Sequence, residues 1–235
     1  MKQFFVALLI FGFIFSCSEE NTKLTFIEVN SLKNDNAVIE INIPKANGNS
    51  QIAKNINSKI ENHIANMLVF LEEDSDTLSL DFAIKSFDTE YASFKEGFTD
   101  SALVWDASFD GEVTYQSSSL TSIPITSYIN SGGAHGNTNI TFFNFDTNGS
   151  VIENNDLFLD KDAFIKVAKT YFIEEVKDTN VDQHYIDNFE LPANIGFNDE
   201  GVILFYNVYE IASYADGFTE FTIPFEEVEN FLKIE

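Results

Sequence analysis

The chain has 235 residues, enough for one sizeable core or two small, tightly joined domains, and its 25 phenylalanines indicate a packed interior. It carries 38 acidic residues against 13 lysines and no arginine; the net charge of −25 excludes nucleic acid as a partner and suits either a cationic partner or simple solubility. Cys17 is the only cysteine, which excludes an intramolecular disulfide.

Residues 1–16 are predicted to be a lipoprotein-type signal peptide. Lys2 supplies a positive charge, Phe4–Phe15 is an apolar run, and the small residue Ser16 precedes Cys17. The run is well short of the ~20 apolar residues that a membrane-spanning helix needs. We therefore expect a cleaved leader rather than a transmembrane anchor.

Cys17 lies where the cysteine of a bacterial lipobox is acylated. The run Ile14-Phe15-Ser16-Cys17 resembles the looser lipobox of Bacteroidetes-like lipoproteins, although phenylalanine is unusual beside the serine. Several acyl chains, at ~0.8 kcal/mol per buried methylene, would form a stable anchor. Residues 17–22 form an acidic tether, and Ser18-Glu19-Glu20 resembles the signal that sends lipoproteins to the outer face of the outer membrane. The alternatives are a plain cleaved signal with an incidental cysteine and a tether that is merely solvated.

Alternating and helical patterns divide the first half of the chain. We expect strands where apolar and polar residues alternate, over Leu24–Asn30, Ala37–Ile43, Leu78–Ile84 and Leu103–Phe109. Between the second and third strands, apolar residues recur every three or four positions to Leu71, which predicts a long helix beginning near Ser50. The acidic run Glu72–Asp76 is predicted to be loop, because acids oppose the dipole at a helix C-terminus. Asp110-Gly111 signals a hairpin.

The second half begins at a glycine-rich loop, Asn130–Asn139, which joins a strand over about Leu120–Ile129 to a return strand over Ile140–Phe145. Asn148-Gly149 is predicted to close the next turn. The elements expected after it are a helix within Leu157–Val176 capped by Asp160, a central strand over Val202–Tyr209, a strand over Phe218–Ile223, and a short helix from Pro224. The fold class is therefore α+β, a mostly antiparallel sheet with one long helix in the N-terminal half, a second helix and a short C-terminal helix packed against it.

The glycine-rich loop contains His135, on which an enzymatic interpretation would depend. Ser131 is close in sequence, but a loop bracketed by glycines does not fix the geometry between a base and a nucleophile, and the context of a nucleophile elbow is missing. The structural alternative is an imidazole that bonds a neighbouring carbonyl or carboxylate. The spacing of His63, His135 and His184 does not suit a metal, so we expect neither metal nor cofactor.

Aromatic residues gather around the late strand and the loop after it: Tyr206, Tyr209, Tyr214 and Phe218. Exposed tyrosines can stack on sugar rings or anchor a protein partner, although core packing explains most of them. Tyr214 lies in a loop of small residues that ends at Gly217. We therefore expect Tyr214 to be the exposed ring.

The order of several short motifs resembles a known arrangement of domains. The motifs are Ser131–Asn137, Phe143–Gly149, Asn155–Phe158, Asp199–Gly201, Tyr209–Gly217 and Phe221–Phe225. They resemble the paired extracytoplasmic domains of unknown function in RsiV-type lysozyme-sensing anti-sigma factors and PdaC-type peptidoglycan deacetylases. By this resemblance, residues 23–145 form a PdaC-type N-terminal domain and residues 146–235 an RsiV-type C-terminal domain, packed as one unit.

The resemblance implies an envelope-facing binding domain. Together with the lipobox-like run, it leads us to expect a protein that binds without catalysis and is lipid-anchored to the outer membrane through Cys17. Its ligand would be a cell-wall glycan, a peptidoglycan fragment or a lysozyme-like basic protein. The predicted binding residues are Gly133, His135, Asn137, Tyr214 and Asp216. The alternatives are a hydrolase that acts on wall glycans or their acyl groups through His135, and a structural envelope protein. The run Ala212-Ser213-Tyr214 departs from the Ala-Pro-Tyr common in the family, which affects the details of that surface.

Overall fold

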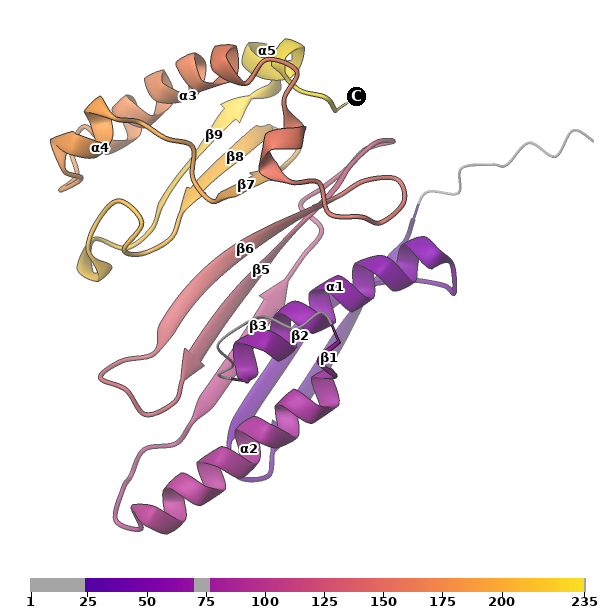
Figure 1. Ribbon diagram of the computed structural model, residues 1–235, viewed down its shortest axis with the longest axis vertical. Coiled ribbons are helices and arrows are strands. Elements are labelled where there is room, and N and C mark those ends of the chain that lie inside the picture. The colour runs from indigo at the N-terminus through magenta and orange to yellow at the C-terminus, as the bar shows by residue number, and fades with distance from the viewer. Residues whose placement is uncertain (1–23, 70–76, 235) are drawn as a thin grey trace, which may run out of the picture.

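The computed structural model describes residues 24–69 and 77–234, which form two β-sheets flanked by helices (Figure 1). The larger sheet contains β1 (Phe26–Asn34), β2 (Val38–Ala46), β3 (Asp106–Gly111), β4 (Tyr115–Gln116), β5 (Thr121–Asn130) and β6 (Asn137–Phe145). The smaller sheet contains β7 (Asn194–Phe197), β8 (Gly201–Tyr206) and β9 (Thr219–Pro224). Paired strands are antiparallel except β2 and β3. The predicted α+β class is confirmed.

Helices cover the outer face of each sheet. The helices are α1 (Gln51–Leu68), α2 (Leu80–Gly97), α3 (Lys161–Val176), α4 (Gln183–Asp187) and α5 (Phe225–Val228). In Figure 1, α1 and α2 lie against the larger sheet and α3 lies across the smaller one, with the long β5–β6 hairpin between the two halves of the molecule. The order of layers is therefore helices, larger sheet, smaller sheet, helix.

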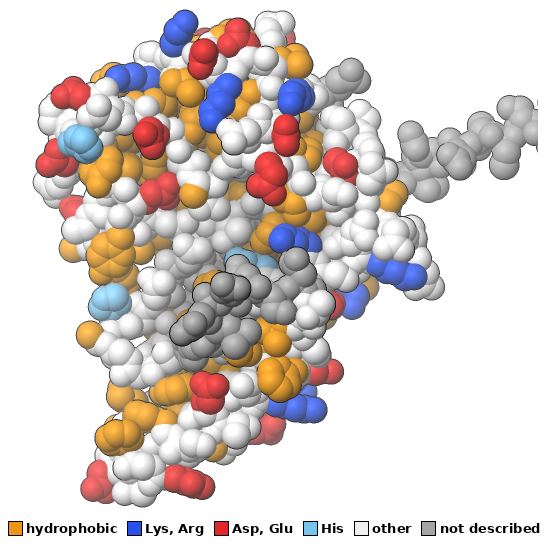
Figure 2. All heavy atoms as spheres, in the orientation of Figure 1, with side chains coloured by type: hydrophobic (Ala, Val, Ile, Leu, Met, Phe, Trp, Pro, Cys, Tyr) orange, Lys and Arg blue, Asp and Glu red, His pale blue; other side chains and the backbone are white. Residues whose placement is uncertain are grey.

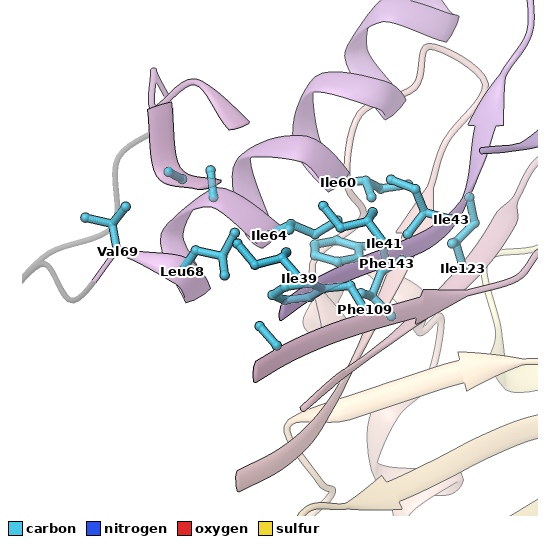
Figure 3. Close-up of a cluster of buried hydrophobic side chains, with 14 of the residues drawn as sticks. Ile39, Ile41, Ile43, Ile60, Ile64, Leu68, Val69, Phe109, Ile123 and Phe143 are labelled. Carbon is cyan, nitrogen blue, oxygen red and sulfur yellow. The ribbon is translucent and has the colours of Figure 1, made fainter. Parts of the chain in front are cut away.

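The first core forms between α1 and β2. Ser50 caps α1 by accepting a hydrogen bond from the Ala53 amide, as the predicted start near Ser50 requires. Figure 3 shows side chains from one face of α1 directed at the alternating isoleucines of β2 and at rings from β3 and β6. The buried members include Ile39, Ile41, Ile43, Ile60, Ile64, Leu68, Phe109 and Phe143. The helical and alternating patterns in this region predicted the correct structure.

The predicted strand over Leu78–Ile84 is wrong, because this segment enters helix α2. The buried residues of α2 are Ala83, Phe87 and Tyr91, spaced four apart as a helical stripe requires. Phe82, inward-facing in the predicted strand, is 57% exposed. The N-terminal half thus has two long helices rather than one. Both belong to the crossover that connects the parallel strands β2 and β3.

The predicted hairpin at Asp110-Gly111 is also wrong. Gly111 is the last residue of β3, which pairs with β2 and β5, whereas β4 pairs with β5. A Cβ atom on Gly111 would lie 2.5 Å from Cδ1 of Ile125. Close packing, rather than a turn, accounts for glycine there. By contrast, Gly149 has a φ of 74°, as the predicted Asn148-Gly149 turn requires.

A second core lies between α3 and the smaller sheet. Asp160 caps α3 as predicted, and Phe164, Ala168, Phe172 and Val176 are buried against β8 and β9. Every residue of β8 is buried, so the prediction of a central strand covered on both faces is confirmed. This core is assembled mostly from residues late in the chain, together with Tyr115 of β4 and Leu120, which precedes β5.

The predicted signal peptide, Cys17 with its lipid, the tether and the Glu72–Asp76 loop lie outside the described residues and stay predictions. Within residues 24–69 and 77–234, no helix combines the length and apolar character needed to cross a bilayer.

Candidate functional site

The glycine-rich loop connects β5 to β6 at the edge of the larger sheet. Gly132 has a φ of 88°, and a Cβ atom there would lie 3.0 Å from Nε1 of Trp105. Gly136 is buried, and a Cβ atom on it would meet the Tyr128 ring at 2.3 Å. These two glycines let the loop fold onto aromatic rings. The loop thereby gains a fixed shape and presents His135 at the surface.

The structure brings His135 into direct contact with Tyr214. The two rings stack with centroids 4.2 Å apart and an interplanar angle of 26°. The Tyr214 hydroxyl donates to the Gly136 carbonyl at 3.2 Å, and His135 Nδ1 lies 2.8 Å from the same oxygen. The β5–β6 loop of the larger sheet and the β8–β9 connection of the smaller sheet, which are distant in the sequence, thus share one contact. Figure 2 shows hydrophobic and histidine side chains together on this margin of the molecule.

Tyr209 extends the stack, a role that the sequence analysis did not assign to it. Its ring centroid lies 5.8 Å from that of Tyr214, at an interplanar angle of 32°. Tyr209 is 63% exposed, whereas Tyr214 is half-buried, so the prediction that Tyr214 is the exposed ring is wrong. Tyr209, which follows β8, has a φ of 68° and is the only described non-glycine residue with a positive φ. This backbone conformation accompanies the exposure of its ring. No local motif predicts this conformation.

Asp216 shapes the loop that carries Tyr214. Its carboxylate accepts hydrogen bonds from the hydroxyl and amide of Ser213, closing the short 3-10 turn Tyr214–Asp216. Asn180 donates to the other carboxylate oxygen at 2.8 Å. The Ser213 hydroxyl, followed by the Asn180 amide, lowers the pKa of Asp216 below its usual value. Asp216 is therefore an ionised, exposed acceptor beside the aromatic stack, and Asn180 is a neighbour that sequence reasoning missed.

The other predicted residues occupy the same edge without joining the stack. Gly133 is exposed at the tip of the loop, and Asn137 is exposed at the first position of β6, opposite Ile129. The backbone does not require glycine at position 133, because φ is not positive there and a Cβ atom would contact only the His135 carbonyl oxygen, at 3.6 Å. The structure thus unites His135 with Tyr214, places Asp216 beside them, and leaves Gly133 and Asn137 as flanking positions.

Polar side chains join the two sheets behind the stack. Asn207 uses its amide oxygen and nitrogen to bond the backbone N–H and C=O of Ile140, each at 2.9 Å. Asn194 accepts from the Phe142 amide at 3.1 Å, and Asn144 donates to the Ile195 carbonyl at 2.7 Å. These bonds replace strand pairing between β6 and the smaller sheet. The stack is therefore held on a rigid junction.

The chemistry available to His135 is limited. Within the described residues its only hydrogen-bond partner is the Gly136 carbonyl, so no carboxylate orients the imidazole toward a nucleophile. His184 on α4 bonds the side chain of Asn188, the residue after that helix, and the His63 ring packs edge-on against Phe143. In the described part of the chain, no three histidine, cysteine or acidic side chains are placed so that they could hold a metal ion. The arrangement is suited to contact through aromatic faces.

The fold and this junction define a two-domain α+β protein with an aromatic contact between its domains. Residues 31–138 match the family model described as "Deacetylase PdaC", and residues 155–226 match the model described as "Protein of unknown function (DUF3298)". The chain therefore combines a PdaC-type domain with a DUF3298 domain, the combination of a cell-envelope accessory protein of unknown function.

Two solved structures show the same fold. A DUF3298 family protein from Bacteroides fragilis NCTC 9343 aligns over 90% of this chain and 94% of its own, with a TM-score of 0.61 and 20% identity. A DUF3298 family protein from Pseudomonas aeruginosa PAO1 aligns over 89% of this chain and 94% of its own, with a TM-score of 0.56 and 19% identity. No curated protein matches the chain.

Proposed function

We propose that this protein is a non-catalytic, lipid-anchored binding protein of the cell envelope that holds a cell-wall glycan against His135, Tyr214 and Tyr209. The observation that carries the proposal is the ring stack at the domain junction, with Tyr209 exposed at one end and His135 at the other. Aromatic faces supply large apolar contact at little entropic cost, and they commonly line sites for small ligands.

Polar groups beside the rings would orient a sugar. Asp216 offers an ionised acceptor, and the exposed amide groups of Asn137 and Asn180 offer donors and acceptors for hydroxyl groups. A few placed polar groups around an aromatic surface are typical of sites that bind small ligands. A hydrolase would need an oriented base, and His135 is bonded to a carbonyl instead of a carboxylate.

The binding test compares two histidine–tyrosine pairs on the same molecule. His135→Ala/Tyr209→Ala removes both exposed ends of the stack, whereas His184→Ala/Tyr185→Ala removes a similar pair from α4. Calorimetric titration with soluble peptidoglycan fragments is expected to show at least tenfold weaker binding for the first variant and unchanged binding for the second. Equal affinities for both variants, or no binding by the wild type, would refute the glycan site.

A basic protein ligand is a second candidate, favoured by the net charge of −25. Lysozyme-like proteins are cationic, and an acidic surface steers such partners over roughly a Debye length, about 8 Å at physiological salt. Retention of lysozyme by the immobilised protein should then fall steeply with added salt and be insensitive to the Tyr209 change. Salt-independent retention, or none at low salt, would exclude this candidate.

Turnover and anchoring have separate tests. If the wild type releases acetate or reducing sugar from peptidoglycan, and a folded His135→Ala variant does not, the hydrolase would replace the binding proposal.

The lipid anchor is tested by mass spectrometry of the protein from membranes, which should find a diacyl or triacyl modification on Cys17. An unmodified thiol would refute the lipid anchor while leaving the binding site untouched.

A further inference from the structure

A groove of about 520 Å³ lies between the inner faces of the two sheets. Pro124, Thr126, Ile140 and Phe142 line it from β5 and β6, and Ile203, Phe205 and Glu220 line it from β8 and β9. The segment Glu112–Thr114 and Asn198 complete the lining. The volume falls within the range of ordinary small-ligand sites.

The groove is separate from the aromatic stack. It lies along β6 at Ile140 and Phe142, whereas the stack lies beyond the start of that strand at Asn137. At ~3.4 Å per residue, Phe142 is roughly 17 Å along the strand from Asn137. The groove and the stack therefore have different lining residues, and an inference about the groove does not depend on the glycan proposal.

The lining of the groove combines apolar side chains with two carboxylates, that of Glu112 on the segment between β3 and β4 and that of Glu220 on β9. Ile140, Phe142 and Pro124 are half-buried at its floor, while Glu112 and Glu220 are exposed on its rim. The lining residues include no lysine and no histidine. The salt bridges within the described residues join other carboxylates, so neither rim glutamate is neutralised by a cation of the chain there.

Glu220 lies in an environment that lacks a cation. Partial burial of the carboxyl group first, and then the negative charge of Glu175 on α3, raise the pKa of Glu220 above its usual value. A positively charged group in the groove would compensate both effects. The hydroxyls of Thr114 and Thr126 and the amide of Asn198 could meanwhile bond peptide groups.

We propose that this groove binds a short peptide bearing a free ammonium group, with the ammonium between Glu112 and Glu220 and the aliphatic part of its side chain on Ile140 and Phe142. A lysine-like side chain fits because it joins an apolar stem to a charged head. The described residues gather no third acidic, histidine or cysteine ligand, so the two carboxylates are arranged for an organic cation rather than a metal ion.

The test uses N-terminally acetylated Ala-Lys-Ala and its Nε-acetyl-lysine counterpart as probes, so that the lysine side chain carries the only ammonium group. Binding is followed by the amide chemical shifts of the full protein. We expect saturable shifts confined to the groove lining with the amine, and none with the Nε-acetylated peptide. Glu112→Gln/Glu220→Gln should weaken binding about tenfold, because each ion pair contributes modestly at a partly exposed site.

The matched control is Glu90→Gln/Glu96→Gln, which removes the same charge from exposed positions of α2 beyond the opposite face of the larger sheet. This variant should bind as the wild type does. Equal weakening of peptide binding in both double variants would show that the overall negative charge attracts the peptide, and would refute the proposed site. So would equal binding of the Nε-acetylated peptide, or the absence of saturable shifts in the groove. A failure of the glycan titration leaves these outcomes unchanged.

Discussion

The two sheets are buried in different ways. The smaller sheet is covered on both sides, by α3 against Val202 and Leu204 and by the larger sheet against Phe205, whose ring lies 6.2 Å from that of Phe142. The larger sheet is covered by α1 and α2 on one face. On its opposite face, β5 and β6 meet the smaller sheet, while β2 and β3 carry the exposed carboxylates of Glu40 and Asp110. The first domain therefore contains its own core, whereas the second borrows part of its cover from the first.

This asymmetry predicts that damage to the second core stays local. Phe172 is fully buried between α3 and the smaller sheet, and Phe172→Ala should lower the free energy of unfolding of that domain by about 3–5 kcal/mol. Trp105 is the only tryptophan and packs against Phe87 in the first domain, so its fluorescence reports that domain alone. As the Phe172→Ala variant unfolds, the loss of circular dichroism from the second domain should precede the change in Trp105 fluorescence from the first.

The reciprocal variant is Ile60→Ala in the first core. Because the second domain relies on the first for cover, both signals should then shift together. Coincident transitions in Phe172→Ala would contradict the asymmetry and show that the sheets unfold as one unit. Phe82→Ala, at an exposed position of α2, should change the free energy of unfolding by no more than about 0.5 kcal/mol, whichever of the two signals is used to measure it.

The next effect concerns the contact between the sheets. A Cβ atom on Gly196 would lie 1.9 Å from Cδ1 of Phe142, so Gly196→Ala should force the sheets apart and cost about 1–3 kcal/mol. Gly97→Ala is the matched control, since nothing lies within 4 Å of a Cβ atom there. Denaturant titration measures both variants. A Gly196→Ala protein as stable as the control would mean that the sheets are loosely apposed.

Sequence patterns predicted the parts of the fold in which neighbouring residues share one environment. The stripe from Ile56 to Ile64 and the alternation from Ile39 to Ile43 repeat often enough to identify an element. Leu78–Ile84 shows how a short alternating run misleads, because the helical stripe of α2 becomes recognisable only when Phe87 and Tyr91 are included. The positive φ of Tyr209 has no local sequence signal at all.

The candidate site was predictable only in part, for a related reason. The glycines marked the first loop, and the order of motifs drew attention to Tyr214 and Asp216. However, the bond between Tyr214 and Gly136 spans 78 residues and depends on how the two sheets meet. Periodicity carries no information on such a contact. The groove was likewise missed, since it forms from separate strands whose residues show no common motif.

Acid should affect the two domains in opposite directions. Asp88 on α2 accepts hydrogen bonds from Asn36 and Ala37; burial raises its pKa, but the Asn36 side chain and both backbone amides together lower it below the usual value. This stabilisation is present above the unfolded pKa, about 3.9, and is lost as pH falls through the lowered folded value. Asp88→Asn should cost the first domain about 1 kcal/mol at pH 7, because charged acceptors make stronger hydrogen bonds, and should reduce its acid sensitivity. An unchanged pH profile of Trp105 fluorescence would contradict this role.

The smallest expected effect on stability comes from Glu220, and its pH dependence is opposite to that of Asp88. Its raised folded pKa means that the ionised form is disfavoured in the folded second domain, so the penalty is present at neutral pH and relieved as pH falls from the folded pKa toward the unfolded value near 4.3. In the absence of ligand, Glu220→Gln should slightly stabilise the second domain at pH 7 and remove this relief. Glu112→Gln removes an equal charge from the other rim and controls for the reduction of net charge. If both variants raise stability equally, the relevant factor is the overall negative charge of the chain rather than the proximity of Glu220 to Glu175, and the contrast between the domains would then rest on packing alone.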